Sequence, residues 1–234
     1  MKWVLHHKAE TVSTNLDARA GRPGDVFTAD FQTAGRGRLD HTWQSAPGEN
    51  LMLSAVLDVA DLAPEQVATL PLAVGLAVVR GLSPFLRGSS PCRLKWPNDV
   101  LVDGRKLCGI LCERQGDAVI AGLGVNVSQR KFPKDIENRA VSLALLGSVP
   151  TVAEVRDAVL DALAGVYAAW RKGGFAAVYP ELVAHDYLRG RTLGVVQTDD
   201  DRAPVKGVCG GIQDDGSLLV GGIRVYAGEA HVLL

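Results

Sequence analysis

The chain has 234 residues, 47% of them hydrophobic and 22% charged, and a net charge of −1 at neutral pH. This composition is typical of a folded globular protein with one main core and a small second domain, rather than of an intrinsically disordered chain. The near-zero net charge argues against binding to DNA or membranes through an overall basic surface, so any anion site must be built locally.

The four cysteines, at positions 92, 108, 112 and 209, have no CxxC spacing, and the five histidines provide no spaced pair beside them. We therefore expect no protein metal site and interpret the cysteines as reduced, buried thiols. The first residues show no signal-peptide pattern, and no apolar run approaches the ~20 residues of a membrane span. These features predict a cytoplasmic protein without a membrane partner.

The first predicted element is a strand over Lys2–His7, and a helix opens shortly after it. Thr14 and Asp17 have the spacing of a capping box, and Ser13 is an alternative N-cap. The three consecutive polar side chains of Ser13-Thr14-Asn15 exceed what one cap needs, and they lie where backbone amides point outward. Capping and ligand binding are both open interpretations of this segment.

A predicted strand over Asp25–Phe31 leads into the polar segment Gln32-Thr33-Ala34-Gly35-Arg36-Gly37-Arg38, in a loop that runs to residue 49. Glycine lets the backbone approach a ligand closely, and arginine offers a permanently charged planar fork suited to phosphate or carboxylate. The segment therefore has the composition of an anion clamp, with a solvated turn as the alternative. Loops of this length in compact domains are usually functional or disordered.

The next elements carry no chemistry. Asn50–Val59 is apolar on both faces, as expected of a strand inside a sheet, and Pro64–Leu86 is a long apolar helical segment that we expect to be broken or kinked at Pro71. Both are predicted core elements.

Asp103-Gly104 between two apolar runs indicates a two-residue hairpin, so Asn98–Val102 and Arg105–Glu113 should be antiparallel neighbours. This pairing would place four polar side chains, Lys95, Asn98, Asp99 and Lys106, on two adjacent strands. Lysine is a poor strand residue, so its presence indicates either a functional role or a solvated edge position.

Ala118–Val127 is a predicted buried strand in which Gly122 and Gly124 leave room for a close neighbour or a ligand. Asn126 near its end is an amide in apolar surroundings, and a buried amide must find hydrogen-bond partners in the protein or in a ligand. Residues 128–140 read as a charged loop.

Thr151 and Glu154 form a predicted capping box for an amphipathic helix that ends at Gly173-Gly174, and a further helix covers about 175–187. From Arg191 onward the chain consists of short β runs, including a hairpin at Asp215-Gly216, as in a small barrel. The elements together predict an α+β fold: a mixed or antiparallel sheet packed with helices over residues 1–187, and a small β-barrel over residues 188–234.

Four motifs, in this order, resemble the successive signatures of the biotin protein ligases: Gly35-Arg36-Gly37-Arg38 with Trp43 following, Lys95-Trp96-Pro97-Asn98-Asp99, Arg105–Leu111 and Gly122–Val127. Ser13-Thr14-Asn15 resembles the opening motif of that family. The resemblance covers residues 10 to 127 and implies a class II synthetase-like catalytic domain followed by an SH3-like barrel.

The resemblance implies a ligase that works in two steps. Biotin and ATP would give biotinyl-5′-AMP and pyrophosphate, with Mg²⁺ carried in by the nucleotide, and a lysine of a biotin carboxyl carrier protein would then take the biotinyl group. The implied partner is therefore a subunit of acetyl-CoA carboxylase, and self-association as a homodimer is left open. Because the adenylate is a reactive anhydride, we expect residues 32–48 to become ordered over it and exclude water.

The resemblance also implies residue roles. Ser13, Thr14 and Gln32 would hydrogen-bond the ureido head of biotin, and Arg36 and Arg38 would grip its carboxylate and the phosphate. Since two like charges ~4 Å apart repel by about 4 kcal/mol at an effective dielectric constant of ~20, cations are needed where carboxylate and triphosphate meet.

Lys106 would hold the carboxylate and then the adenylate, Asn126 matches a nucleotide-binding position, and Trp43 matches the aromatic that covers the adenylate. Arg38, Lys106 and Asp99 are the implied catalytic residues, although a carboxylate such as Asp99 is a poor base toward an ammonium and its role is either to orient or to deprotonate the acceptor lysine. The other positions matched to the ligand site are Asn15, Gly35, Gly37, Lys95, Asn98 and Gly109.

The loop departs from the family pattern, because Leu39, Asp40, His41 and Thr42 stand where many relatives have further basic residues. No helix-turn-helix pattern precedes Ser13, so we expect no DNA partner. The nearest alternative function is a lipoate or octanoate ligase, whose arginine-rich, glycine-triplet signature is not seen here. A non-catalytic interaction module is the alternative from another class, and single-strand nucleic-acid binding is disfavoured by the net charge.

Overall fold

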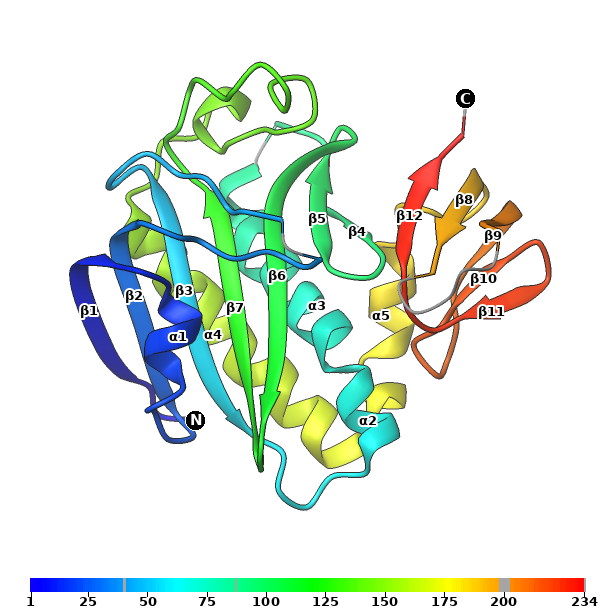
Figure 1. Cartoon of the computed structure of the whole chain (residues 1–234), viewed down its shortest axis with the longest axis horizontal. Helices are drawn as coiled ribbons and strands as arrows, with labels where there is room; N and C mark the ends of the chain where they lie inside the picture. Colours follow the sequence, from blue (N-terminus) through cyan, green and yellow to red (C-terminus); the bar gives the residue numbers. More distant parts are fainter. Residues whose placement is uncertain (40, 87, 198–202, 234) are drawn as a thin grey trace.

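The computed structural model describes residues 1–39, 41–86, 88–197 and 203–233. Within them, seven strands form one sheet in the order β1-β2-β3-β7-β6-β5-β4, and five strands form a second sheet in the order β11-β10-β9-β8-β12. Figure 1 shows the large sheet as the body of the molecule, with the smaller sheet beside its β4 edge.

The strands of the large sheet are β1 (Val4–Thr11), β2 (Asp25–Gln32), β3 (Asn50–Asp58), β4 (Arg93–Lys95), β5 (Asp99–Val102), β6 (Arg105–Gln115) and β7 (Ala118–Asn126). β1 pairs with β2 in parallel, and the other neighbours pair antiparallel, so the predicted mixed sheet is confirmed. The strands of the second sheet, all antiparallel, are β8 (Thr192–Val196), β9 (Val205–Ile212), β10 (Leu218–Val220), β11 (Ile223–Val225) and β12 (Glu229–Val232).

Helices cover both faces of the large sheet. The α-helices are α1 (Thr14–Ala18), α2 (Pro64–Ala68), α3 (Leu70–Leu82), α4 (Val152–Gly173) and α5 (Tyr179–Ala184), and the 3₁₀ turns are η1 (Ser83–Leu86), η2 (Ala144–Leu146) and η3 (Phe175–Ala177). In Figure 1 the long helices α3 and α4 lie behind the sheet, and the short α1 lies in front of β2 and β3. The front face beside α1 is left free for a site.

The central strand β3 is buried along eight consecutive residues, which confirms the prediction from its continuous apolar run. The α4 capping box is also confirmed, because Thr151 Oγ1 accepts from the amide of Glu154 and the Glu154 carboxylate accepts from the amide of Thr151. Its apolar stripe is buried against α3, including the fully buried Trp170, whose indole donates to Thr69 Oγ1 at 2.9 Å.

Three local predictions need correction. Ser13 is the N-cap of α1, as the alternative interpretation expected, but it makes no side-chain cap hydrogen bond, and Thr14 is the first helical residue, so the Thr14/Asp17 capping box is not formed. The helical segment breaks at Thr69 rather than at Pro71, because Pro71 fits the first turn of α3, where no amide partner is needed. Lys95 is on the edge strand β4, Asp99 is on β5 and Lys106 is on β6, so the polar set spans three strands rather than two.

The hairpin prediction is confirmed: Val102 and Arg105 are register partners around Asp103 and Gly104, whose φ angles of 51° and 74° are left-handed. Glycine meets this requirement without strain, and aspartate tolerates it. The hairpin places Asp99 on β5 opposite Gly109 on β6, and it places Lys106 near the start of β6, close to Asp99.

The two sheets share a continuous hydrophobic core. Polar contacts also cross the junction, because the Trp96 indole donates to the carbonyl of Gly216 at 3.1 Å and the Tyr179 hydroxyl donates to the carbonyl of Ile212 at 3.0 Å. Among the described residues, the five strands of the second sheet pair in a row, with no pairing between β11 and β12. That this sheet is an SH3-like barrel and that a domain boundary lies at residue 188 stay predictions.

None of the described helices is long and apolar enough to cross a membrane. The four cysteines are unpaired, and burial raises the pKa of the Cys92 thiol to about 12, so it stays neutral.

Candidate active site

A cleft of about 840 Å³ opens on the front face of the large sheet. It is lined by the start of α1, the arginine loop, strands β4 to β7, the loop after β7 and the end of the chain. Of the residues that the sequence placed in a site, all but Gly35 line this cleft. The fold therefore brings together segments that are far apart in the sequence.

One end of the cleft is a polar pocket formed by the start of α1 and the end of β2. The backbone amide and the hydroxyl of Thr14 both donate to Gln32 Oε1, at 2.7 and 3.0 Å. Because the oxygen of Gln32 is used in this way, its Nε2 donors remain for another partner. Ser13 is 2% exposed, and within the described chain its hydroxyl makes no hydrogen bond.

Asn15 is held by the protein. Its Nδ2 donates to Glu113 Oε2 at 2.7 Å, and its Oδ1 accepts from the buried Ser54 hydroxyl at 2.6 Å. Gly122 makes room for it, because a Cβ at that position would lie 2.0 Å from Asn15 Oδ1. The predicted ligand contact by Asn15 stays a prediction, while the geometry gives it the task of shaping the pocket.

The two arginines of the loop point to different partners. Arg36 Nη1 donates to Glu113 at 2.9 Å, behind the polar pocket. Arg38 Nη1 is 3.3 Å from Asn98 Oδ1 and 3.4 Å from the carbonyl oxygen of Gly228, just before β12. Arg38 is therefore the loop cation that faces the β5–β6 side of the cleft, while Arg36 is occupied.

Lys106 and Asp99 form an ion pair on that side, with 2.7 Å between Nζ and Oδ1. Asp99 Oδ1 is buried, and the Lys106 ammonium is the group that compensates its charge there. Lys106 Nζ is also 5.8 Å from the centre of the Trp43 ring, within cation–π range. The pair holds the ammonium at the wall of the cleft.

The floor of the cleft is a pair of glycines, Gly109 and Gly124, which are register partners on β6 and β7. The Trp43 ring lies on this floor: a Cβ at Gly124 would be 2.4 Å from it, and one at Gly109 would be 3.1 Å from it. The indole Nε1 of Trp43 is buried without a partner in the described chain. An unpaired buried donor is costly, so this ring is suited to meeting a ligand acceptor or to moving when one binds.

Asn126 closes the far side of the floor and is 4% exposed. Its Nδ2 donates to the carbonyls of Val141 and Lys106, at 3.0 and 3.3 Å. Both amide hydrogens are thus used by the backbone, and the side-chain oxygen is left to accept a hydrogen bond from a ligand hydroxyl or amine.

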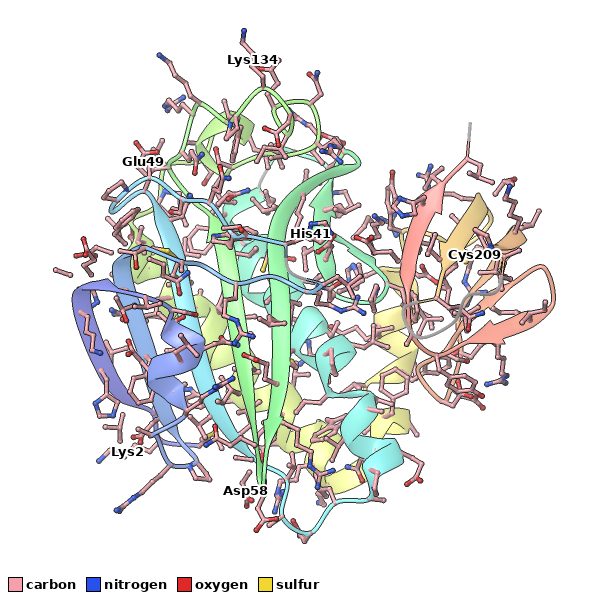
Figure 2. All side chains as sticks on the ribbon, in the orientation of Figure 1. Lys2, His41, Glu49, Asp58, Lys134 and Cys209 are labelled. Atoms are coloured by element: carbon pink, nitrogen blue, oxygen red, sulfur yellow. The ribbon has the colours of Figure 1, made fainter. Side chains whose placement is uncertain are left out.

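The arginine loop is a compact turn. Trp43 donates to the carbonyl of Gly35 at 3.0 Å, Gly37 donates to the carbonyl of His41 at 2.7 Å, and Arg36 and Thr42 form an isolated bridge. Figure 2 labels His41 where this loop crosses in front of β6. Among the loop positions that depart from the family pattern, Asp40 lies outside the described residues.

The sequence missed several residues that line or support the cleft. Phe132, Ile136 and Arg139 reach it from the loop after β7, for which the sequence predicts only a charged loop. The available signal was Phe132, the single aromatic residue of this charged loop, whose apolar ring needs a partner to cover it. Further missed residues are Ser54 and Glu113, which support the polar pocket from outside, and Tyr187, Glu229 and His231, which line the cleft from the C-terminal part.

The sequence model of the biotin/lipoate A/B protein ligase family matches residues 7–129. The chain is 35% identical to a biotin–[acetyl-CoA-carboxylase] ligase of Mycobacterium tuberculosis, over 96% of this chain and 86% of that protein. It is 30% identical to the ligase of the same name from Paracoccus denitrificans, over 92% of each chain. Its fold superposes on the biotin protein ligase of Aquifex aeolicus in complex with biotin and ATP with a TM-score of 0.86, at 28% identity over 98% of each chain. The chain belongs to the biotin/lipoate A/B protein ligase family.

Proposed function

We propose that this protein is an ATP-dependent biotin protein ligase, which activates biotin as biotinyl-5′-AMP and transfers it to a lysine of the biotin carboxyl carrier protein of acetyl-CoA carboxylase. Relatives that match most of the chain carry that name, and a structural neighbour was solved with biotin and ATP. The observation that carries the proposal is one cleft with a polar pocket at one end and Arg38 and Lys106 at the other.

The polar pocket favours biotin over lipoate. The ureido group of biotin has two N–H donors and a carbonyl acceptor, whereas the dithiolane ring of lipoate has no comparable groups. Ser13, Thr14 and Gln32 offer hydroxyl and amide groups to match the ureido group. A site built to hydrogen-bond its substrate rejects an analogue that lacks those groups, because its own buried polar atoms are then left unpaired.

The cations at the other end serve the first step, in which the carboxylate oxygen of biotin attacks the α-phosphorus of ATP and pyrophosphate leaves. Lys106 would exchange Asp99 for the substrate carboxylate, and Arg38, held by Asn98, would meet the phosphate. A cation placed before reaction at the position where negative charge accumulates stabilises the transition state without further reorganisation.

Mg²⁺ bound to the nucleotide would neutralise part of the triphosphate charge. Within the described residues, no group of three or more His, Cys, Asp or Glu side chains could hold a metal ion. Magnesium commonly binds through substrate phosphates with few protein ligands, so the residues present fit an ion that arrives with ATP.

In the second step the neutral amine of the acceptor lysine attacks the carbonyl carbon of the mixed anhydride, the bond from that carbon to the phosphate oxygen breaks, AMP leaves, and the proton of the amine is released. Asp99, freed from Lys106, would orient the incoming amine or take its proton. The glycine-rich turn over residues 35–43 would keep water from the adenylate between the steps, since it already lies over the β6–β7 floor through Trp43. We place this reaction in the reducing cytoplasm, in keeping with four unpaired cysteines, and a homodimer stays a prediction.

Biotin-dependent exchange of pyrophosphate into ATP tests the proposal. We expect exchange with biotin and none with lipoate. Exchange with lipoate alone would select the lipoate ligase, and no exchange with either would remove the ligase function. Arg38→Ala and Lys106→Ala should each lose at least about a hundredfold in rate, because each removes a preorganised cation. Lys2→Ala, at an exposed position far from the cleft, is the matched control and should keep the full rate (Figure 2).

A further inference from the structure

Glu113 lies on β6 outside the lining of the cleft, yet it contacts two segments that form it. Oε2 accepts from Asn15 Nδ2 at 2.7 Å, and Arg36 Nη1 donates to Oε1 at 2.9 Å and to Oε2 at 3.3 Å. Arg19 Nη2 is a further 3.6 Å neighbour of Oε1. One carboxylate therefore connects the polar pocket to the arginine loop.

On the pocket side, Glu113 begins a chain of hydrogen bonds. Asn15 accepts from Ser54 at 2.6 Å, Ser54 Oγ is 2.8 Å from Thr14 Oγ1, and Thr14 in turn contacts Gln32. The chain is buried, with Ser54 0% and Asn15 5% exposed.

The charge of Glu113 fixes the direction of this chain. An ionised carboxylate only accepts, so Asn15 must turn its amide nitrogen to Glu113 and its oxygen to Ser54. The Ser54 hydroxyl then donates its hydrogen to Asn15 Oδ1 and, more weakly, to Thr14 Oγ1, while the Thr14 hydroxyl donates to Gln32 Oε1. The orientation of the side chains that form the pocket is thus linked to Glu113, a residue outside the lining of the cleft.

On the loop side, Arg36 is the anchor of the compact turn that carries Trp43 and Arg38 over the floor. Its side chain is 41% exposed, so an isolated ion pair at this position would contribute little. The Glu113 carboxylate is, however, held in one orientation by Asn15, so Arg36 has a fixed partner rather than a mobile one.

We propose that Glu113 is a positioning residue that couples the two halves of the cleft: by holding Asn15 and Arg36 at once, it makes head-group recognition and closure of the arginine loop one event. The inference rests on the proposed function, because the head group it concerns is that of biotin. A ligand that orders the Ser13–Asn15 pocket would also order Asn15, Glu113 and the Arg36 turn, and a loop without this link would close independently of the pocket.

The test uses the full chain and the variant Glu113→Gln, which keeps the shape, removes the charge and allows Asn15 to flip. We expect the KM for biotin in pyrophosphate exchange to rise about tenfold or more with little change in the KM for ATP. We also expect biotin to lose its protection of residues 32–48 against limited proteolysis. The double variant Glu113→Gln with Arg36→Gln should have a biotin KM no higher than that of the more impaired single variant, since the two substitutions remove the same contact.

Glu181→Gln is the matched control, because Glu181 forms an arginine ion pair with Arg80 away from the cleft. It should leave both KM values unchanged. A folded Glu113→Gln variant with unchanged biotin KM and unchanged protection would overturn the proposal, as would equal losses for biotin and ATP or additive effects in the double variant. If Glu113→Gln does not fold, Glu113→Asp replaces it, and loss of folding in both would make Glu113 a stability residue. Absence of exchange in the wild type would instead remove the proposed function.

Discussion

Thr14 uses its backbone amide and its hydroxyl on one oxygen of Gln32, and this double contact decides which atoms of Gln32 are free. Asn126 shows the reverse, since its amide hydrogens are used by backbone carbonyls and its oxygen is free. At the scale of single residues, internal hydrogen bonds therefore determine which group of each side-chain amide, the oxygen or the nitrogen, remains available to a ligand.

Gly124→Ala tests the glycine floor. The added methyl group would lie 2.4 Å from the Trp43 ring, which is too close for two non-bonded carbons, so the ring and the turn that carries it must shift. We expect the rate of biotin-dependent pyrophosphate exchange to fall at least about tenfold, a loss of 1.4 kcal/mol or more in transition-state binding.

Gly165→Ala, in the middle of α4, is the control for this change, because a Cβ there meets nothing within 4 Å. It should keep the exchange rate and raise the free energy of unfolding by up to about 1 kcal/mol, the difference in helix propensity. Equal activity of both variants would show that Trp43 has no fixed place on the floor.

At the scale of elements, side-chain hydrogen bonds stabilise the turn between β9 and β10. Asp215 lies in the turn between β9 and β10 and accepts from the amide and hydroxyl of Ser217, from Tyr226 and from Arg224. Burial raises the pKa of Asp215, but these hydrogen bonds together outweigh it and lower the pKa to about 2. The ionised form is thus favoured in the folded turn.

The second sheet should therefore lose stability as the pH falls from about 4 toward 2. A carboxylate whose pKa is lowered by folding stabilises the folded state above its unfolded pKa of 3.8, and this contribution is lost as the pH falls toward 2. Denaturant unfolding of wild type and Asp215→Asn should differ most at pH 5 and converge near pH 2. Asp214→Asn, at an exposed neighbour, is the control, and a gap for Asp215→Asn that does not shrink with acid would contradict the assignment.

At the scale of the whole molecule, the segment between α5 and β8 fixes the two sheets against each other. The linker pairs with β4, because Leu94 donates to the carbonyl of His185 at 2.7 Å and Tyr187 donates to that of Leu94 at 2.8 Å. Asp186, which is 9% exposed, accepts from the amides of Leu188 and Ile212, each at 2.9 Å. This junction positions Gly228 against Arg38, so the second sheet completes the cleft.

Asp186→Ala should destabilise the protein by at least about 2 kcal/mol, because it leaves buried amide donors unpaired. It should also lower the exchange rate, since Arg38 and the C-terminal lining of the cleft depend on the junction. Chemical denaturation and exchange assays measure both effects. Asp161→Ala, an exposed position on α4, should stay within about 0.5 kcal/mol of wild type. A stable Asp186→Ala variant would mean that the junction does not rest on this carboxylate.

The sequence by itself determined features that depend on neighbours along the chain. The Asp103-Gly104 hairpin, the Thr151 capping box and the buried run of β3 follow from backbone freedom, capping and apolar pattern, all of which act over a few residues. The ordered motifs likewise contain many of the residues that line the cleft, because residue type and spacing are visible without a fold.

Only the tertiary structure decided which partners these residues have. Glu113 is 77 residues from Arg36 and 98 from Asn15, and no local pattern predicts contacts at that separation. The break at Thr69 and the free hydroxyl of Ser13 were likewise decided by packing rather than by propensity. A hydrogen bond needs both groups at about 3 Å with the right angle, and that condition is met only once sheet register and loop path are fixed.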